Sequence, residues 1–253
     1  MPETMHRFDI GQFRCTAIAD TDRGARNVLL LEGERRILVD TGIGSHDPEN
    51  PGCLSARLEE LGVGARLIDT VVLTHGDFDH IGGATDGSRL AFPGAEHFIS
   101  RTEVEFWKQR PTRLAPSTLY DEAFRSRVNS VPPTAIQALE HRLQLIESGA
   151  VEVVKGVTMI TAPGHTPGNS VVRVESQGSV LLCVADLFYQ AENLTTPDWV
   201  SQYDYDPKQV VKTRRRLLDE AASQGSLLMA YHLPFPGLGR VRRKGSAWEW
   251  RAA

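Results

Sequence analysis

Cysteine is scarce in this sequence of 253 residues. Its three cysteines, Cys15, Cys53 and Cys183, are odd in number and lie far apart along the chain. A disulfide framework needs paired cysteines, and a zinc site built from thiolates needs cysteines at short, regular spacings. The sequence therefore argues against both classes, and metal ligands would have to be nitrogen and oxygen atoms.

Long apolar segments are absent as well. No apolar run approaches the roughly 18 residues needed to span a bilayer. The N-terminal stretch MPETMHRFDIGQFRC contains no apolar region of the kind found in a signal peptide. We therefore expect a soluble, cytoplasmic protein.

The charge balance gives no basis for a polyanionic partner. The net charge is −4 at pH 7, and the two basic runs, at 214–216 and 242–244, are short and lie near apolar or acidic residues. Binding to nucleic acid or to an anionic membrane needs a more extended concentration of positive charge. We interpret both runs as solvated faces and expect a small-molecule substrate, with neither nucleic acid nor a membrane as partner.

Short apolar runs bounded by turn residues recur in both halves of the chain and predict β-strands. They lie at residues 27–31, 37–39, 67–73, 96–100, 151–154, 157–160, 170–174, 180–184 and 227–230. Helical spacing of Leu54, Leu58 and Leu61, and of apolar residues between Pro207 and Gly225, predicts helices among these runs. This arrangement predicts a mixed α/β protein in which two sheets share a core between helical layers.

Residues from about 101 to 148 differ in composition from the rest of the chain. They are rich in Arg, Gln, Glu and Ser, contain four prolines, and show helical apolar spacing only in patches. We interpret this segment as a helical insertion that lies over the domain and covers a pocket.

Polar side chains follow several of the predicted strands directly. The stretch THGDFDHIGG, residues 74–83, places His75, Asp77, Asp79 and His80 within six positions. Two carboxylates and two imidazoles so close together indicate a metal, which neutralises carboxylates and binds neutral imidazoles. Three further residues occur in the same setting, and they are His165, Asp186 and His232. Loops at strand ends commonly meet in one cleft, and nitrogen and oxygen ligands leave zinc, iron and manganese all open.

The order and spacing of these clusters resemble the metallo-β-lactamase-fold metallohydrolases, whose pattern is H-x-H-x-D-H followed by separate His, Asp and His. The resemblance runs from Asp40-Thr41-Gly42 to His232 and the trailing PFPGLGRV. It is strongest to the branch that contains the N-acyl homoserine lactonases and methyl parathion hydrolase. It implies an αββα sandwich of two mixed sheets flanked by helices, as a single domain over residues 1–253, in a branch whose members often form homodimers.

By position, the resemblance also implies a centre with two divalent metal ions. The implied ligands are His75, Asp77 and His165 for the first metal, Asp79, His80 and His232 for the second, and Asp186 as a bridge between them. Asp40 matches a carboxylate that hydrogen-bonds a ligand imidazole and fixes its tautomer. Tyr189 resembles the tyrosine that contacts the substrate carbonyl in the lactonases, and a core aromatic residue beside Phe188 is the alternative interpretation.

Asp77 departs from the family pattern, which has histidine at this position. Aspartate is shorter than histidine and adds negative charge, which weakens the Lewis acidity of the metals and shifts the preference from zinc towards iron or manganese. We interpret Asp77 as a metal ligand. An acid placed behind the ligands and a relic of a lost site are the alternatives.

The function that follows from the resemblance is hydrolysis by a metal-bound hydroxide. The substrate is expected to be a small lactone, ester or phosphoester, with Asp79 transferring a proton to the leaving group and Tyr189 holding the oxyanion. Zinc is the first choice of metal, with iron or manganese as alternatives. Two other functions stay open, namely a metal-containing binding or regulatory protein with little turnover and an iron-dependent redox enzyme.

Overall fold

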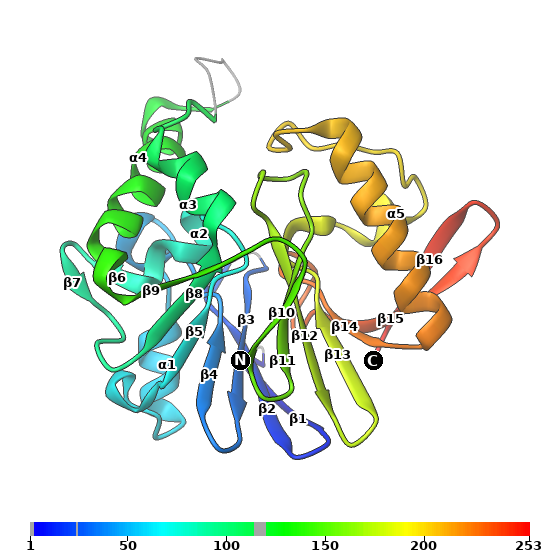
Figure 1. Ribbon diagram of the computed structural model, residues 1–253, viewed down its shortest axis with the longest axis horizontal. Helices are drawn as coiled ribbons and strands as arrows, with labels where there is room; N and C mark the ends of the chain where they lie inside the picture. The colour runs from blue at the N-terminus through cyan, green and yellow to red at the C-terminus, as the bar shows by residue number, and fades with distance from the viewer. Residues whose placement is uncertain (1–2, 24, 114–119) are drawn as a thin grey trace.

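The computed structural model describes residues 3–23, 25–113 and 120–253. Two seven-stranded sheets pack face to face at its centre (Figure 1). The first sheet has the order β1-β2-β3-β4-β5-β8-β9 and the second has the order β10-β11-β12-β13-β14-β15-β16. Both sheets are mixed, because β4, β5, β8 and β9 are parallel in the first and β13 and β14 are parallel in the second. The predicted sandwich of two mixed sheets is confirmed.

The helices form the two outer layers, with α1, α3 and α4 against the first sheet and α5 against the second (Figure 1). The α-helices are α1 (Leu54–Glu60), α2 (Phe78–Ile81), α3 (Arg101–Lys108), α4 (Glu122–Leu139) and α5 (Pro207–Gln224). The short 3₁₀ helices are η1 (Gly44–His46), η2 (Ala65–Leu67), η3 (Gly82–Ala84), η4 (Glu140–Arg142), η5 (Ala185–Leu187) and η6 (Ala191–Leu194). As predicted, α5 begins at a proline and ends before Gly225, whose φ of 64° suits glycine.

The strands of the first sheet are β1 (Met5–Ile10), β2 (Phe13–Ala19), β3 (Asn27–Glu32), β4 (Arg36–Val39), β5 (Thr70–Val72), β8 (Glu96–Ser100) and β9 (Leu143–Ile146). Those of the second are β10 (Ala150–Val154), β11 (Val157–Thr161), β12 (Ser170–Ser176), β13 (Ser179–Cys183), β14 (Leu227–Met229), β15 (Leu238–Lys244) and β16 (Ala247–Ala252). A separate two-stranded ribbon consists of β6 (Thr85–Asp86) and β7 (Arg89–Leu90).

Several continuous apolar runs of the sequence are strands buried on both faces. In β3, Leu29 and Leu31 belong to the core between the sheets, whereas Val28 and Leu30 belong to the core beneath the helices. A strand covered on both sides has no polar face, so it reads as an unbroken apolar segment. This explains why β3, β4, β5 and β12, in which most residues are buried, are predictable from the sequence.

The segment expected to be a helical insertion is helical only in part. It contains α3 and α4, but residues 143–146 form β9, which extends the first sheet by pairing with β8. Residues 114–119 of this segment lie outside the described residues. The sheet edge supplies a partner for Leu143–Ile146, and this tertiary contact is not visible in the local composition.

The two basic runs are only partly solvated. Arg242, Arg243 and Lys244 are exposed in β15, as expected. Arg214 is fully buried and donates hydrogen bonds to three carbonyl groups, so its assignment to a solvated face is wrong. The acceptors are the carbonyl oxygens of Leu187, Pro197 and Trp199. A guanidinium group carries enough donors to satisfy several buried carbonyls at once, which allows its burial inside this layer.

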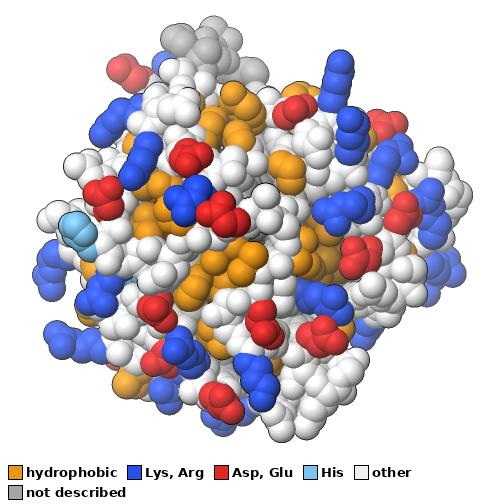
Figure 2. Space-filling view, in the orientation of Figure 1, with side chains coloured by type: hydrophobic (Ala, Val, Ile, Leu, Met, Phe, Trp, Pro, Cys, Tyr) orange, Lys and Arg blue, Asp and Glu red, His pale blue; other side chains and the backbone are white. Residues whose placement is uncertain are grey.

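The described residues include no helix that is long and apolar enough to cross a membrane. Figure 2 shows one face of the molecule, on which Lys and Arg side chains are interspersed with Asp and Glu. Surface ion pairs among the described residues include Arg215 with Asp198 at 2.7 Å and Arg242 with Glu249 at 3.1 Å.

Five loops at one edge of the sandwich bring the polar clusters together. Asp40 follows β4, residues 74–80 follow β5, and His165 lies in the loop after β11. Asp186 and His232 follow the parallel strands β13 and β14. Strands that run in the same direction end at the same edge of a sheet, so both sheets direct these loops to one place.

A buried histidine makes the stability of the fold sensitive to acid. His97 is fully buried in β8, and burial lowers its pKa from 6.5 to about 4. Between these values the unfolded chain binds a proton that the folded protein does not bind. The contribution of His97 to stability is therefore complete above pH 6.5 and is lost as the pH falls towards 4, by about 3 kcal/mol.

We therefore expect the free energy of unfolding, measured with urea, to decrease less between pH 7 and pH 4.5 in His97→Leu than in the parent protein. His141 is exposed in η4, so His141→Gln serves as a control that keeps the parental pH dependence. An unchanged slope in His97→Leu would show that this imidazole does not couple folding to pH.

Candidate metal centre

Four imidazoles meet at the shared edge of the sheets, and each presents Nε2 to the centre. Their Nδ1 atoms are all occupied by partners outside the cluster. These partners are Thr74 Oγ1 for His75 (3.0 Å), Asp40 Oδ2 for His80 (2.9 Å), Asp204 Oδ1 for His165 (3.1 Å) and the Ala25 carbonyl for His232 (3.1 Å). Outer contacts of this kind fix the ring orientation and the tautomer of an imidazole that binds metal through its other nitrogen.

The first group of converging atoms lies around His75 and His165. Asp77 Oδ2 is 3.0 Å from His165 Nε2 and 4.0 Å from His75 Nε2. Asp186 Oδ2 is 3.6 Å from His165 Nε2. Ligand atoms of His75, His165 and Asp186 all lie within 4.8 Å of one another.

The second group lies around His80 and His232. Asp186 Oδ1 is 2.9 Å from His80 Nε2, and Asp186 Oδ2 is 3.2 Å from His232 Nε2. Asp79 Oδ2 is 3.8 Å from His232 Nε2. The carboxylate of Asp186 therefore lies between the two groups, and the structure brings all seven expected ligands together.

The donor atoms fit divalent metal ions in kind and in spacing. Two ligands on a tetrahedral zinc ion with bonds of about 2.0–2.2 Å lie about 3.3–3.6 Å apart. The separations between imidazole and carboxylate atoms, from 2.9 to 4.0 Å, bracket this value. His75 Nε2 and Asp77 Oδ1 are buried and form no hydrogen bond within the described residues, which leaves them available as ligands.

The electrostatics of the cluster favour added positive charge. Burial lowers the pKa of His75 well below its ordinary value, which keeps this imidazole neutral. Burial also opposes protonation of His80 and His165, but nearby carboxylates outweigh it. They raise the pKa of His80 well above its ordinary value and that of His165 to about 10. The buried carboxylates thus stabilise positive charge placed next to them. A proton on an imidazole supplies one positive charge, and a divalent ion supplies two.

Asp40 ties the end of β4 to the ligand loop after β5. Besides His80 Nδ1, it accepts hydrogen bonds from the backbone N–H of Thr74 at 2.8 Å and from the Thr74 hydroxyl. Its φ of 63° is unusual for a residue other than glycine, and the cost of this conformation is offset by these contacts. Asp40 therefore has the contact to a ligand imidazole that the sequence led us to expect.

Glu103 is a buried carboxylate that the sequence pattern does not single out. It lies in α3, which looks like an ordinary amphipathic helix, yet it is fully buried. Burial raises the pKa of Glu103, while hydrogen-bond donors on both oxygens favour its charged form. The donors are the Gly76 N–H (2.9 Å), the Trp107 indole N–H (2.8 Å), the Thr166 hydroxyl (2.6 Å) and the Gly168 N–H (3.0 Å). Glu103 thereby joins the loop of His75 to the loop of His165.

A cavity of about 290 Å³ opens beside the cluster. Phe78, Phe124 and Val128 give it an apolar wall, and Arg26 and Arg113 contribute positive charge. Ligand pockets commonly combine a mostly apolar lining with a few polar groups that orient the ligand.

Each arginine of the cavity contacts one aspartate of the cluster. Arg26 Nε is 3.4 Å from Asp79 Oδ2, and Arg113 Nη2 is 3.4 Å from Asp77 Oδ2. Burial works to raise the pKa of Asp77, but Arg113 and His165 outweigh it and hold this pKa below its usual range. Asp77 is therefore ionised at neutral pH.

Tyr189 lines the cavity, whereas its neighbour Phe188 packs in the core of the second sheet. The Tyr189 hydroxyl lies 3.1 Å from His165 Nδ1, and its ring stacks on that of His232 at a centroid distance of 5.1 Å. Burial raises the pKa of Tyr189 well above its ordinary value, so the hydroxyl keeps its proton and can donate it in a hydrogen bond.

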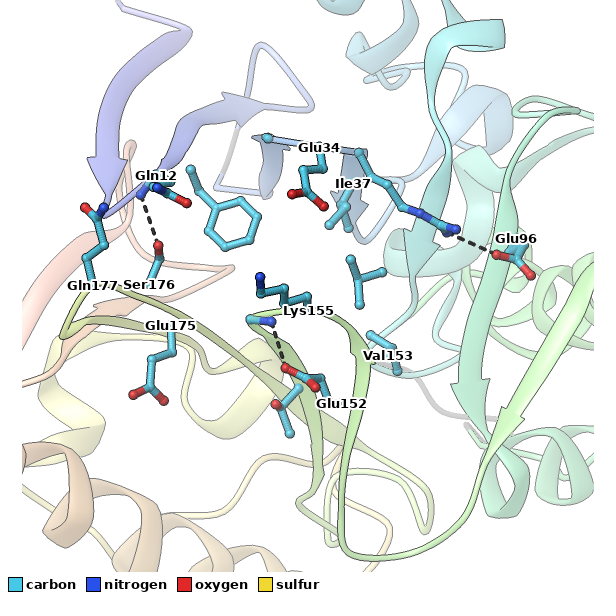
Figure 3. A pocket seen from close by; sticks show the side chains of 16 residues that line it. Gln12, Glu34, Ile37, Glu96, Glu152, Val153, Lys155, Glu175, Ser176 and Gln177 are labelled. Carbon is cyan, nitrogen blue, oxygen red and sulfur yellow. Dashed lines mark hydrogen bonds and ion pairs between the residues drawn. The ribbon is translucent and has the colours of Figure 1, made fainter.

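A second hollow, of about 760 Å³, lies at the opposite end of the sandwich (Figure 3). Arg35 lines it just before β4, whereas Asp40 follows that strand. Some of its polar groups are engaged locally, since Arg35 pairs with Glu96 at 3.2 Å and Glu152 accepts a hydrogen bond from the Gly156 N–H at 2.8 Å. No histidine is among its described lining residues, so the smaller cavity is the one with metal-binding chemistry.

The sequence profile of the metallo-beta-lactamase superfamily matches residues 21–232. This chain belongs to the metallo-β-lactamase superfamily. Among relatives, an N-acyl homoserine lactonase of Bacillus thuringiensis is 26% identical over 225 residues, which cover 81% of this chain and 79% of that protein. A probable metallo-hydrolase of Mycobacterium tuberculosis is 27% identical over 222 residues, which cover 76% of this chain. The match spans 62% of the length of that mycobacterial protein.

Solved structures of the superfamily superpose on nearly the whole chain. AidC, a dizinc quorum-quenching lactonase in complex with the product N-hexnoyl-L-homoserine, has a TM-score of 0.89 at 27% identity, covering 98% of this chain and 97% of AidC. The hydrolase AbOPH, at 22% identity, has a TM-score of 0.85 and covers 100% of this chain and 98% of its own, which shows a shared metallo-β-lactamase fold.

Replacing Glu103 tests its role in joining the two loops. Glu103→Gln keeps the size of the side chain but has one acceptor oxygen in place of two, so it leaves buried donors without partners. We expect a loss of about 2–4 kcal/mol in the free energy of unfolding, measured by chemical denaturation. Glu105→Gln changes an exposed residue of the same helix and should alter stability by less than about 0.5 kcal/mol. Equal effects of the two substitutions would contradict this role.

Proposed function

We propose that this protein is a dinuclear metal-dependent hydrolase of small lactones or esters. The observation that carries the proposal is the convergence of four imidazole Nε2 atoms on buried carboxylates, with every Nδ1 atom held from outside. Such an arrangement serves metal binding and has no equally good explanation in packing, because it concentrates polar groups in the interior.

In this proposal, His75, Asp77 and His165 would hold the first metal ion. Asp79, His80 and His232 would hold the second, and Asp186 would serve both. Zinc is the first choice because nitrogen-rich sites suit it, and the three carboxylates keep iron and manganese as alternatives. The dizinc assignment of AidC supports this choice.

When bound, two divalent ions would activate water near neutral pH and polarise the carbonyl oxygen of a substrate. The residues that line the cavity would act on the substrate bound next to these ions. Asp79 borders the cavity and carries a carboxylate suited to proton transfer towards the leaving group. The Tyr189 hydroxyl donates a hydrogen bond to the oxygen on which negative charge develops. Phe78 and Phe124 exclude water and contact the apolar part of the substrate.

The substrate class rests on the relatives and on the size of the cavity. Both the Bacillus thuringiensis protein and AidC are named lactonases. The cavity volume of about 290 Å³ is at the lower end of the range for ligand pockets, which suits a small acyl compound. A lactone or ester carbonyl is therefore favoured over a phosphoester.

Metal removal tests the catalytic role of the centre. Dialysis against a chelator should abolish hydrolysis of short-chain lactones and p-nitrophenyl esters. Stepwise return of zinc, iron(II) or manganese(II) should restore activity, reaching its maximum at two equivalents. Activity that survives complete removal of metal would contradict the proposal. Binding of two equivalents without turnover of any lactone or ester would instead favour a binding protein.

Removal of one hydroxyl tests the role of Tyr189. Tyr189→Phe should lower kcat by about tenfold to a hundredfold with a smaller change in KM, because the lost hydrogen bond is strongest in the transition state. Metal content, measured by elemental analysis, should stay at the parental value.

Tyr203→Phe is a matched control for this substitution. Tyr203 also lines the cavity, but its hydroxyl donates a hydrogen bond to the Tyr120 hydroxyl at 2.6 Å. A parental kcat in Tyr189→Phe, or an equal loss in both variants, would assign Tyr189 to packing.

A further inference from the structure

The side chain of Asp77 faces the metal cluster although its backbone position offers a different partner. Asp77 is the N-cap residue of α2, with φ −61° and ψ 148°, and an aspartate there ordinarily accepts a hydrogen bond from the first turn of the helix. No such bond forms. The carboxylate turns instead towards His165 Nε2 at 3.0 Å, and its side chain is 12% exposed.

Arg113 also contacts this carboxylate, through the same oxygen as His165. It lies between α3 and α4, and its side chain is 5% exposed. Nη2 is 3.4 Å from Asp77 Oδ2 and donates a hydrogen bond to the Tyr203 carbonyl at 2.6 Å. The backbone N–H of Arg113 donates to Asn129 Oδ1 at 2.7 Å, and the guanidinium carbon lies 5.9 Å from the centre of the Phe106 ring. Three separate segments therefore hold the guanidinium group in place.

A buried guanidinium group next to a divalent metal site needs an explanation, because like charges repel strongly where water is excluded. A carboxylate between them supplies it. A histidine at position 77 would give a neutral ligand, and the pair of Asp77 and Arg113 is also neutral in sum. The pair thus replaces the histidine of the family pattern without a change in the net charge of the first metal position.

We propose that Asp77 and Arg113 act as one unit at the first metal position, in which the Asp77 carboxylate is the ligand and Arg113 is a positioning residue that fixes and neutralises this carboxylate. The inference rests on the proposed metal-dependent function. The unit has a consequence that a ligand acting alone would not have. Restoring the family pattern by Asp77→His should weaken metal binding, because it leaves the guanidinium group of Arg113 buried without a counter-charge beside the metal.

A double-substitution cycle tests this unit. The parent, Asp77→His, Arg113→Met and the double variant are stripped of metal and titrated with zinc against a chromogenic chelator. Asp77→His should bind zinc at the first position more weakly than the parent. Adding Arg113→Met should then strengthen binding by about tenfold or more in the Asp77→His background and give no comparable gain in the parental background. The absorption spectrum of the cobalt(II)-loaded proteins gives a separate measure of the ligand geometry.

Arg26→Met is the matched control, because Arg26 contacts Asp79 at the second position at the same distance of 3.4 Å. It removes the same charge near the same cluster and should show no coupling to position 77. If Asp77→His does not fold, Asp77→Asn keeps the size of the side chain and should show the same rescue by Arg113→Met.

The outcomes separate this inference from the proposed function. Equal effects of Arg113→Met in both backgrounds, or zinc binding by Asp77→His as tight as that of the double variant, would overturn the inference alone, provided that the parent binds two equivalents and hydrolyses esters. A parent protein that binds no metal in the titration would overturn both.

Discussion

The buried carboxylate of Asp186 is the interaction on which the rest of the site depends. It is 3% exposed and meets the imidazoles of His80, His165 and His232 within 3.6 Å. A carboxylate in such surroundings is stable only when cations or donors surround it. Its neighbours therefore turn their Nε2 atoms inwards, and every outward Nδ1 atom in turn needs a partner behind it.

Both sheets contribute to this centre, so the core between them determines its geometry. The first sheet supplies Asp40 and the loop with His75 and His80, and the second supplies the loops with His165, Asp186 and His232. Asp40 fixes one loop to the end of β4, and Glu103 joins the loops of the two sheets through hydrogen bonds to both. The packing of the two sheets therefore determines the distances between the side chains of the site, since a shift of one sheet would separate its two halves.

Much of the fold, and the convergence of the seven side chains expected to bind metal, could be predicted because the signals are local. Strands buried on both faces appear as apolar runs, and the ligands follow such runs directly. The strands β1, β2, β15 and β16 mix polar with apolar residues and lack this signal. Glu103 and Arg113 were missed because their contacts join residues 63 and 36 positions apart, respectively. Nothing near Glu103 in the sequence separates it from an exposed glutamate on a helix.

We propose that this cluster binds two metal ions and that Asp77 is a ligand of the first. Anomalous diffraction from crystals of the purified protein, recorded at the zinc, iron and manganese absorption edges, tests it most directly. We expect two peaks, one bounded by His75, Asp77 and His165 and the other by Asp79, His80 and His232, with Asp186 between them. A single peak at the second position, with Asp77 bound to Arg113 alone, would contradict it.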